Sequence, residues 1–324
     1  MLISQQSSLK KLRIFHNTLI DFLGKRKLFY VVSLVFIVVG MIVLSINGIP
    51  RGIDFQGGTE LQMRFEKDAN SSDIRSIMDN AGLPGMEIKT MGDEKNLLLR
   101  TPIQGEGQTV ADKIEGALKD NLKDNPFQVM RVDKVGPKIG KELTENALKA
   151  VIFSLFGILI YLSFRFQFVY SLGAVIALFH DVLITISAVA ISDALIPGLR
   201  LELSQTMLAA FLTLIGFSVN DTVIIFDRIR ENIKLFKNED IEKVMNKSVN
   251  ATLSRTIITS GTVFLTVLVL FLFGGEVLRD FSFTFGIGII TGTYSSVFVA
   301  SSIVVDWKHF RLSKDKLTVA AKRR

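Results

Sequence analysis

The sequence predicts a polytopic α-helical membrane protein with six transmembrane helices and one α+β domain outside the membrane, inserted between the first and second helices. Of the 324 residues, 48% are hydrophobic and 21% are charged. The apolar residues come in runs of about twenty, the length that crosses the ~30 Å hydrocarbon core of a bilayer at 1.5 Å per residue. A soluble protein would instead space its apolar residues at helical or strand intervals. The length of the runs therefore favours a membrane protein.

The six apolar runs define the predicted spans. They cover residues 28–47, 147–164, 168–192, 203–226, 253–273 and 281–305. The first run is longer than the apolar region of a signal peptide and lacks a small-residue cleavage site, so it is predicted to remain as an anchor. The parts outside the spans include the N-terminal segment 1–27, the polar insert 48–146 and the basic tail 306–324.

Lysine and arginine residues predict the orientation of the chain. The segment 1–27, the loop 227–252 and the tail 306–324 are basic, and the loop alone carries six Lys or Arg residues. The two short turns on the other side carry one Arg each. Because basic loops stay in the cytoplasm, both termini are expected there. The insert 48–146 is expected on the extracytoplasmic, or periplasmic, side of the cytoplasmic (inner) membrane.

The N-terminal segment contains an amphipathic pattern. Between Leu9 and Leu23 the apolar side chains recur near one helical face, with lysines opposite. That pattern is typical of a helix lying in the membrane surface. The alternative is a partly ordered basic leader that only sets the orientation.

The polar insert has the pattern of an α+β domain, because period-two and helical spacings alternate along it. The predicted elements, in order, are strand 59–65, helix 71–81, strands 86–90 and 97–101, helix 109–122 and strand 127–135. The order β-α-β-β-α-β is that of the ferredoxin-like fold. The insert has no His or Cys and nearly balanced charges. It is interpreted as a surface for a protein substrate or partner.

Several kinds of function are disfavoured by residue content. The chain has no Cys and only three scattered histidines, so neither a thiolate nor a histidine metal site is expected. The net charge of +7 comes largely from the flanks of the membrane spans, which argues for anionic lipid headgroups and against nucleic acid. The segment Gly136–Lys141 (GPKIGK) is one residue too short for a phosphate loop, and Glu142 replaces the Ser or Thr that would hold magnesium. No enzymatic activity and no cofactor are expected.

Charged residues within the spans are the candidate functional groups. Asp181 lies beside His180 in the third span, Asp221 follows Asn220 in the fourth, and Arg255 opens the fifth. A charge at membrane depth costs about 2.5–3.5 kcal/mol on insertion scales, so such residues usually face the bundle interior and serve a pathway. We predict a proton pathway that includes Asp221, Arg255, Asp181 and Asn220.

Alternatives remain open for these groups. Ser218 and Thr222 extend the polar stripe around Asp221, and an arginine that moves near a buried carboxylate changes how strongly it binds a proton. Asp221 and Arg255 could instead form a static ion pair, or Arg255 could extend to the membrane surface. His180 is either a relay partner of Asp181 or a neutral buried histidine bonded to a neighbouring helix.

Glycines in the sixth span predict close helix packing. Gly286, Gly288 and Gly292 lie within an apolar run and not between a strand and a helix, so a nucleotide-binding loop is excluded. The pair Gly288 and Gly292 has the small-xxx-small spacing that lets two membrane helices approach.

Six ordered motifs resemble a known family. They are Gly52–Gly58 (GIDFQGG), Val135–Leu143 (VGPKIGKEL), Phe179–Val182 (FHDV), Gly216–Asn232 (GFSVNDTVIIFDRIREN), Asn250–Ser260 (NATLSRTIITS) and Gly292–Ala300 (GTYSSVFVA). Together they closely resemble the SecF proteins of the SecD/SecF family of protein-export membrane proteins, relatives of the resistance-nodulation-division transporters. The resemblance extends from Gly24 to Trp307.

The resemblance implies a role in protein export and a set of partners. SecF proteins pair with SecD, a second six-helix chain, to form a twelve-helix assembly. That assembly works beside the SecYEG channel, with the accessory protein YajC. It uses the proton-motive force to pull an unfolded translocating polypeptide outward, after SecA has pushed the polypeptide with ATP.

The resemblance also implies roles for individual residues. Asp221 matches the family's membrane aspartate implicated in proton movement, Arg255 matches its partner arginine, and Asp181 lies in a family motif. Gly52–Gly58 matches the link from the first helix to the external domain. The residues expected to serve motifs or packing are Gly52, Asp54, Gly57, Gly58, His180, Arg228, Gly288 and Gly292.

Two other classes of function compete with this expectation. A proton-driven exporter of lipids or small molecules would have a larger external domain and usually both six-helix halves on one chain. A structural scaffold would stabilise a partner complex without moving protons.

Overall fold

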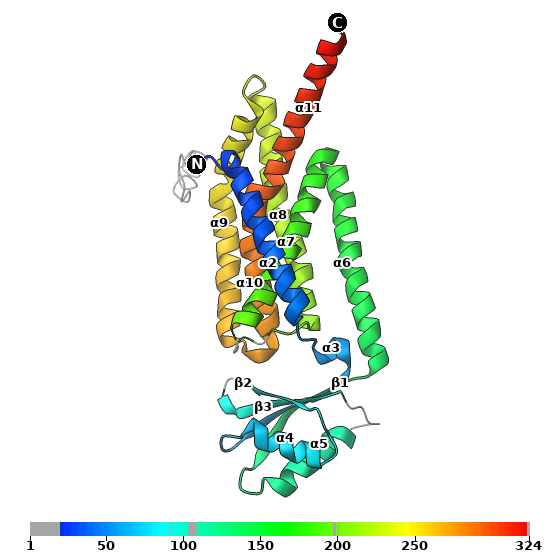
Figure 1. Cartoon of the computed structure of the whole chain (residues 1–324). Coiled ribbons are helices and arrows are strands. Elements are labelled where there is room, and N and C mark those ends of the chain that lie inside the picture. Colours follow the sequence, from blue (N-terminus) through cyan, green and yellow to red (C-terminus); the bar gives the residue numbers. More distant parts are fainter. Residues whose placement is uncertain (1–19, 92, 103–108, 197–198, 200, 323–324) are drawn as a thin grey trace, which may run out of the picture. The chain divides into compact units, whose positions relative to one another are not determined.

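The computed structural model describes residues 20–322, apart from residues 92, 103–108, 197–198 and 200 (Figure 1). The chain forms two compact units. The larger unit is a helical bundle whose described residues fall within 20–49, 151–201 and 206–322. The smaller unit comprises Pro50–Ala150 and the short segment Glu202–Gln205.

The described part of the chain contains six helical spans that are long and apolar enough to cross a membrane, as predicted. The helices that form them are α2 (Arg26–Asn47), α6 (Pro137–Arg165), α7 (Phe168–Leu195), α8 (Gln205–Leu235), α9 (Ile241–Phe273) and α10 (Gly275–Ser295). The 3₁₀ turn η1 (Leu23–Lys25) leads into α2. The sixth span continues from α10 through the π-helical turn η2 (Ser296–Ala300) into α11 (Ser301–Lys322).

Several helices are longer than the predicted spans. The segment 227–252 was expected to be a loop, but only residues 236–240 separate α8 from α9. Asp240 caps α9 by accepting hydrogen bonds from the backbone of Glu242 and Lys243 at 2.8 and 3.3 Å. The second span likewise begins at Pro137, ten residues before its apolar part at 147, and proline is favoured in the first turn of a helix. Apolar content identifies only the part of a helix within the bilayer, because polar helical ends continue into water.

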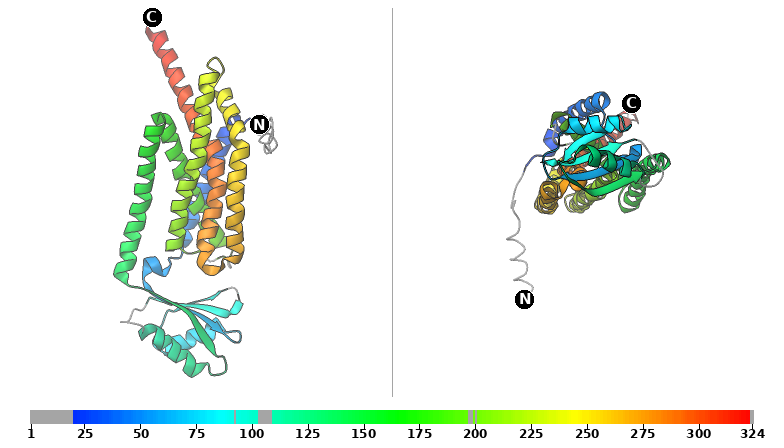
Figure 2. Two further views of the ribbon diagram at one scale, coloured as in Figure 1. Left: turned by 180° about the vertical axis from the view of Figure 1, so that it is seen from behind. Right: turned by 90° about the horizontal axis from the view of Figure 1, so that it is seen from below.

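The interior of the bundle is formed mainly by α7, α8 and the sixth span, while only a small share of the apolar stretches of α2, α6 and α9 is buried. The helix α10 lies against both α7 and α9 (Figure 2). Near one end of the bundle, the ring of Phe226 packs edge to face against Phe166 and Tyr170, with centroids 6.1 and 5.1 Å away. The rings of Phe166 and Tyr170 are tilted against each other with centroids 6.5 Å apart. The exposed apolar helix faces suit contact with lipid or with other membrane helices.

The helices α2 and α7 touch at Gly40, which gives a testable prediction. A Cβ atom added at Gly40 would lie 2.6 Å from the backbone Cα of Ser187, so the helices would have to separate. We expect Gly40→Ala to destabilise the bundle by about 1–3 kcal/mol, the usual cost of overpacking. Gly157→Ala is the matched control, because a Cβ at Gly157 on α6 meets no atom within 4 Å. Equal thermal stabilities of the two purified variants would contradict the prediction.

Among its described residues, the smaller unit contains a four-stranded antiparallel sheet with two helices packed on it. The sheet and these helices are β1 (Gly58–Phe65), α4 (Ser71–Asn80), β2 (Glu87–Met91), β3 (Asp93–Thr101), α5 (Thr109–Asn121) and β4 (Phe127–Val135). The sheet order is β2-β3-β1-β4, and α4 and α5 cover one face (Figure 1). This arrangement confirms the α+β, ferredoxin-like prediction.

The alternation of β1 separates the two faces of this sheet. Leu61, Met63 and Phe65 point into a core shared with Ile74 of α4 and Ile114 of α5. The intervening polar side chains of β1 therefore lie on the face without helices. That face carries the charged residues described below.

The predicted helix over Leu9–Leu23 lies mostly outside the described residues, which begin at Ile20. Where the described residues begin, two asparagines of α9 bind the backbone of the N-terminal chain. Asn250 accepts a hydrogen bond from the Ile20 backbone N–H at 3.0 Å and donates one to the Ile20 carbonyl at 2.9 Å. Asn246 accepts one from the Phe22 N–H at 3.0 Å. The N-terminal chain is therefore fastened to the bundle just before the first span.

Candidate functional site

The candidate site in the bundle is centred on Asp221 of α8. Its side chain is buried, with 2% of the residue exposed, and its Oδ2 accepts a hydrogen bond of 3.0 Å from the Ser260 hydroxyl of α9. Ser218 and Thr222 are buried on the same helix. A carboxylate in such surroundings is stable only with polar partners, and here a hydroxyl from the next helix supplies one.

Arg255 lies on α9, five positions before Ser260, and its side chain is exposed on the surface of the bundle. Its charge attracts that of Asp221. Within the described part of the chain, however, Arg255 forms no ion pair with Asp221. In this conformation the arginine is therefore a nearby charge and not a bonded partner.

A second buried carboxylate, Asp181 of α7, joins three helices. Its Oδ2 accepts hydrogen bonds from Ser218 of α8 at 2.6 Å and from Ser295 of α10 at 2.8 Å. Its Oδ1 lies 3.2 Å from Nδ1 of His180. Only 1% of Asp181 is exposed. Its oxygens are therefore closely satisfied, as buried charges require.

His180 also contacts an aromatic residue of the sixth span. Its ring centroid lies 5.9 Å from that of Tyr294, whose hydroxyl lies 2.7 Å from that of Ser33 on α2. Within the described residues, the Nε2 atom of His180 is buried without a hydrogen-bond partner. The contact with Asp181 is compatible with the predicted relay, whereas the predicted hydrogen bond from His180 to a neighbouring helix is not seen among the described residues.

The polar groups continue into a π-helical turn. The hydroxyls of Thr222 and Ser296 lie 2.9 Å apart, and Ser296 also donates to the Gly292 carbonyl at 2.8 Å. Ser301 donates to the carbonyl of Ser296, five residues earlier, at 3.0 Å. Short π-helical turns are frequent at functional sites in other proteins. Here the turn begins at Ser296, immediately after the serine that binds Asp181.

The glycines of α10 lie against α8 beside these hydroxyls. A Cβ at Gly288 would come within 2.7 Å of the Leu214 side chain, and one at Gly292 within 3.0 Å of Ser218. The absence of side chains at both positions allows α10 to approach α8 where Ser218 and Ser295 reach Asp181.

Two predicted residues lie apart from this cluster. Asn220 is exposed on α8, so it does not share the buried face of Asp221. Arg228 lies further along α8 and pairs with Glu231 at 2.6 Å. The helical period explains the first difference, because neighbouring residues project about 100° apart. Ser260, Ser295 and Ser296 were not singled out from the sequence, since isolated hydroxyls are common in apolar helices.

The Gly52–Gly58 segment folds around the short helix α3 (Ile53–Gln56) in the smaller unit. Gly57 and Gly58 have φ angles of +75° and +132°, and a Cβ at Gly58 would lie 2.5 Å from the Thr101 carbonyl oxygen. Only glycine fits this entry into β1 without strain. Asp54 Oδ2 accepts a hydrogen bond of 2.9 Å from the backbone N–H of Gln205.

A charged cluster, which the sequence did not predict, occupies the face of the sheet without helices. Arg100 of β3 is at its centre, with 9% of its side chain exposed, and it bonds Glu60 of β1 and Glu202 at 2.6 Å each. Lys89 of β2 pairs with Glu202, and Glu87 lies 3.3 Å from Arg100. We name these five residues the Arg100 cluster.

The cluster shifts the pKa values of its members. Burial raises the pKa of Glu60, and attraction to Arg100 offsets this effect only in part. Burial also opposes ionisation of Glu202, but hydrogen bonds and charge from Arg100 and Lys89 outweigh it and hold its pKa below the usual value. For Arg100, burial favours the neutral form, yet Glu202 and Glu60 together leave its pKa above the ordinary value. Glu202 and Arg100 are thus the more strongly stabilised ions.

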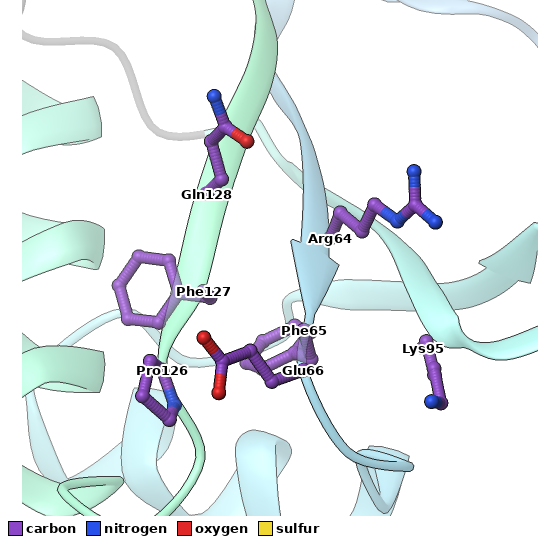
Figure 3. Close-up of a pocket in the computed structure, with 7 residues that line it drawn as sticks. All are labelled: Arg64, Phe65, Glu66, Lys95, Pro126, Phe127 and Gln128. Atoms are coloured by element: carbon purple, nitrogen blue, oxygen red, sulfur yellow. The ribbon is translucent and has the colours of Figure 1, made fainter.

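The smaller unit also has an open cleft of about 430 Å³ where β1, β3 and β4 meet the adjoining loops. It is lined by Arg64, Phe65, Glu66, Lys95, Pro126, Phe127 and Gln128. The ring of Phe127 and Pro126 lie on one side, and Arg64 and Lys95 on the other (Figure 3). Among the described residues, no group of three or more His, Cys, Asp or Glu side chains is arranged to hold a metal ion.

Two buried carboxylates held by hydroxyls inside a bundle of six candidate membrane spans, together with a separate α+β unit, are typical of polytopic membrane transport proteins. Residues 114–310 match the model of the protein export membrane protein SecD/SecF, C-terminal, and residues 42–69 match the SecD/SecF GG motif. The chain belongs to the SecD/SecF family of protein-export membrane proteins.

Individual relatives agree with this assignment. The chain is 41% identical to protein translocase subunit SecF of Rhodothermus marinus, covering 95% of this chain and 100% of the relative. It is 42% identical to the protein of the same name from Calditerrivibrio nitroreducens, covering 92% and 97%.

The crystal structure of SecDF from Thermus thermophilus, a translocon-associated membrane protein, matches with a TM-score of 0.79 and 33% identity over 90% of this chain. A SecDF crystal structure in a super-membrane-facing form matches with a TM-score of 0.68 and 32% identity over 94% of this chain. This chain spans only 39% and 41% of those SecDF chains.

Proposed function

We propose that this chain is a SecF subunit of the protein-export machinery, which acts with SecD to drive the late stage of polypeptide translocation with the proton-motive force. The observation that carries the proton role is the buried carboxylate of Asp221, held by the Ser260 hydroxyl and attracted by Arg255. Family membership supports the export role.

The two carboxylates receive different roles in this proposal. Asp181 accepts hydrogen bonds from two serines at its Oδ2, whereas a single serine is bonded to Asp221 within the described residues. An ionised carboxylate is best satisfied by several donors, so Asp221 is the group that binds and releases the proton. Asp181 holds α7, α8 and α10 together on the same pathway. Movement of Arg255 toward Asp221 favours release of the proton.

The proposed assembly is larger than this chain. The exposed apolar faces of α2, α6 and α9 support contacts with SecD as well as lipid. The SecDF chains are more than twice as long as the part that this chain matches. The extra length supports a second set of membrane helices, which SecD would supply here. SecYEG, YajC, the translocating polypeptide and, indirectly, SecA complete the set of partners.

The proposed orientation places both termini in the cytoplasm and residues 48–146 outside the cytoplasmic membrane. It rests on the basic residues at both ends of the chain and in residues 227–252. No catalytic reaction and no cofactor are part of the proposal.

A paired substitution distinguishes the proton role from a scaffold. Asp221→Leu combined with Arg255→Leu removes both charges together, so no unpaired charge is left in the membrane. We expect the variant to assemble with SecD but to lose the proton-dependent stimulation of export in vesicles with an imposed proton gradient. Thr213→Val, an exposed hydroxyl of α8, is the control and should keep that stimulation. Full stimulation by the double variant would favour the scaffold.

A further inference from the structure

The segment Glu202–Gln205 follows the bundle helix α7 and enters α8, yet its contacts place it in the smaller unit. Its backbone pairs with the chain just before the Gly52–Gly58 segment. Leu203 donates a hydrogen bond of 2.7 Å to the Pro50 carbonyl, and Gly52 donates one of 2.9 Å to the Leu203 carbonyl. These two bonds form a parallel bridge between Arg51 and Leu203.

Side chains reinforce this backbone pairing. Glu202 has 13% of its side chain exposed and is bound by Arg100 of β3 at 2.6 Å and by Lys89 of β2. Although burial opposes ionisation, Arg100 and Lys89 hold the pKa of Glu202 below its usual value, so the segment presents a carboxylate ion to them. The segment is thus held by two strands of the external sheet through charged hydrogen bonds, the stronger kind.

The same segment contains the first residue of α8. Gln205 donates its backbone N–H to Asp54, which satisfies one of the N–H groups left without partners at a helix start. Asp221 lies sixteen residues further along the same helix, about 24 Å at 1.5 Å per residue. A continuous helix transmits a displacement over that length, because its backbone hydrogen bonds resist bending.

We propose that residues 202–205, held by Arg100, Lys89 and Asp54, form a permanent clasp through which a displacement of α8 is passed to the external sheet. This inference rests on the proposed function, since the displacement is the one that proton binding at Asp221 produces. The clasp stays closed throughout the cycle, and Glu202, Arg100 and Asp54 act as positioning residues.

Breaking and locking the clasp test the proposal in the full chain assembled with SecD. Glu202→Gln removes the charge that Arg100 and Lys89 bind. Hydrogen exchange of residues 202–210 should then rise about tenfold or more, since exchange follows local opening, and proton-dependent export should fall by a similar factor. Glu115→Gln, which removes an exposed pairing with Lys119 on α5, should change neither.

The clasp can be locked with a disulfide bond. Because the chain contains no cysteine, two introduced cysteines have only each other to pair with in the chain. Arg51→Cys with Leu203→Cys introduces a pair at the backbone bridge, and its oxidised form should export as well as its reduced form, because a permanent clasp does not open. The reduced form also reports whether the variant folds. If Glu202→Gln fails to fold, the milder Lys89→Gln replaces it with the same expected directions.

The outcomes separate this inference from the proposed function. Unchanged exchange after Glu202→Gln, raised exchange with normal export, or export blocked by the disulfide would each overturn the clasp. Hydrogen exchange is measured without any proton gradient. Its result therefore tests the clasp even if Asp221 proves dispensable for export. Normal export with Asp221→Asn would instead remove the proton role and leave the measured clasp geometry intact.

Discussion

Replacing Asp221 with asparagine is expected to reduce export to the level seen when the proton gradient is dissipated. Asparagine has nearly the same size and still accepts a hydrogen bond from Ser260, so the bundle should stay folded. It cannot bind or release a proton in the physiological range. The late, proton-dependent step of translocation is therefore the step that should be lost.

The measurement is translocation of a secretory polypeptide into vesicles that contain the variant together with SecD, with and without a proton gradient. Asp227→Asn is the matched control, because it makes the same change on the same helix at an exposed carboxylate paired with Arg165. Unimpaired gradient-dependent export with Asp221→Asn would exclude the proposed role of Asp221. Movement of a lipophilic dye by the purified chain alone would instead favour the small-molecule exporter.

Replacing Arg100 with glutamine is expected to destabilise the smaller unit by about 3–5 kcal/mol, the usual cost of removing one partner from a buried ion pair. The side chains of Glu60 and Glu202 are 18% and 13% exposed, so water cannot readily replace the guanidinium. Domains are stable by roughly 5–15 kcal/mol in total. The loss would therefore remove a large fraction of the stability of the domain.

Hydrogen exchange of β1 and β3 in the intact chain measures this loss, since the slowest amides report opening of the whole unit. Arg131→Gln is the control, because Arg131 pairs with Asp133 on β4 while 51% of its side chain is exposed. Exposed pairs contribute about 0–1 kcal/mol. Equal protection in the two variants would show that the Arg100 cluster does not stabilise the sheet.

The α+β domain of the smaller unit illustrates what local patterns predict well. The predicted strand 127–135 coincides with β4, and the predicted helix 71–81 ends one residue after α4. Alternation and helical spacing are properties of neighbouring residues, so a short window of sequence contains them. The ends of α8 and α9 were harder to predict, because both helices continue through charged residues where the apolar run has already stopped.

The candidate site was predictable only in part. Asp181 and Asp221 were identified because a carboxylate in an apolar run is costly without a function. Their partners Ser218, Ser260 and Ser295 come from other helices, and the pairing depends on how the helices rotate about their axes. Asn220 was expected beside Asp221, and the rotation of α8 places it on the exposed face instead.

The sequence by itself determined the six spans, the inserted α+β domain and the two buried carboxylates, because hydrophobicity and periodicity are local properties of the chain. Only the tertiary structure decided that Glu202 meets Arg100, 102 residues earlier in the chain, and that Asp54 caps α8, 151 residues later. Such pairs depend on the packing of distant segments, which no local pattern encodes. Both pairs lie within the smaller unit, where they hold the segment Glu202–Gln205.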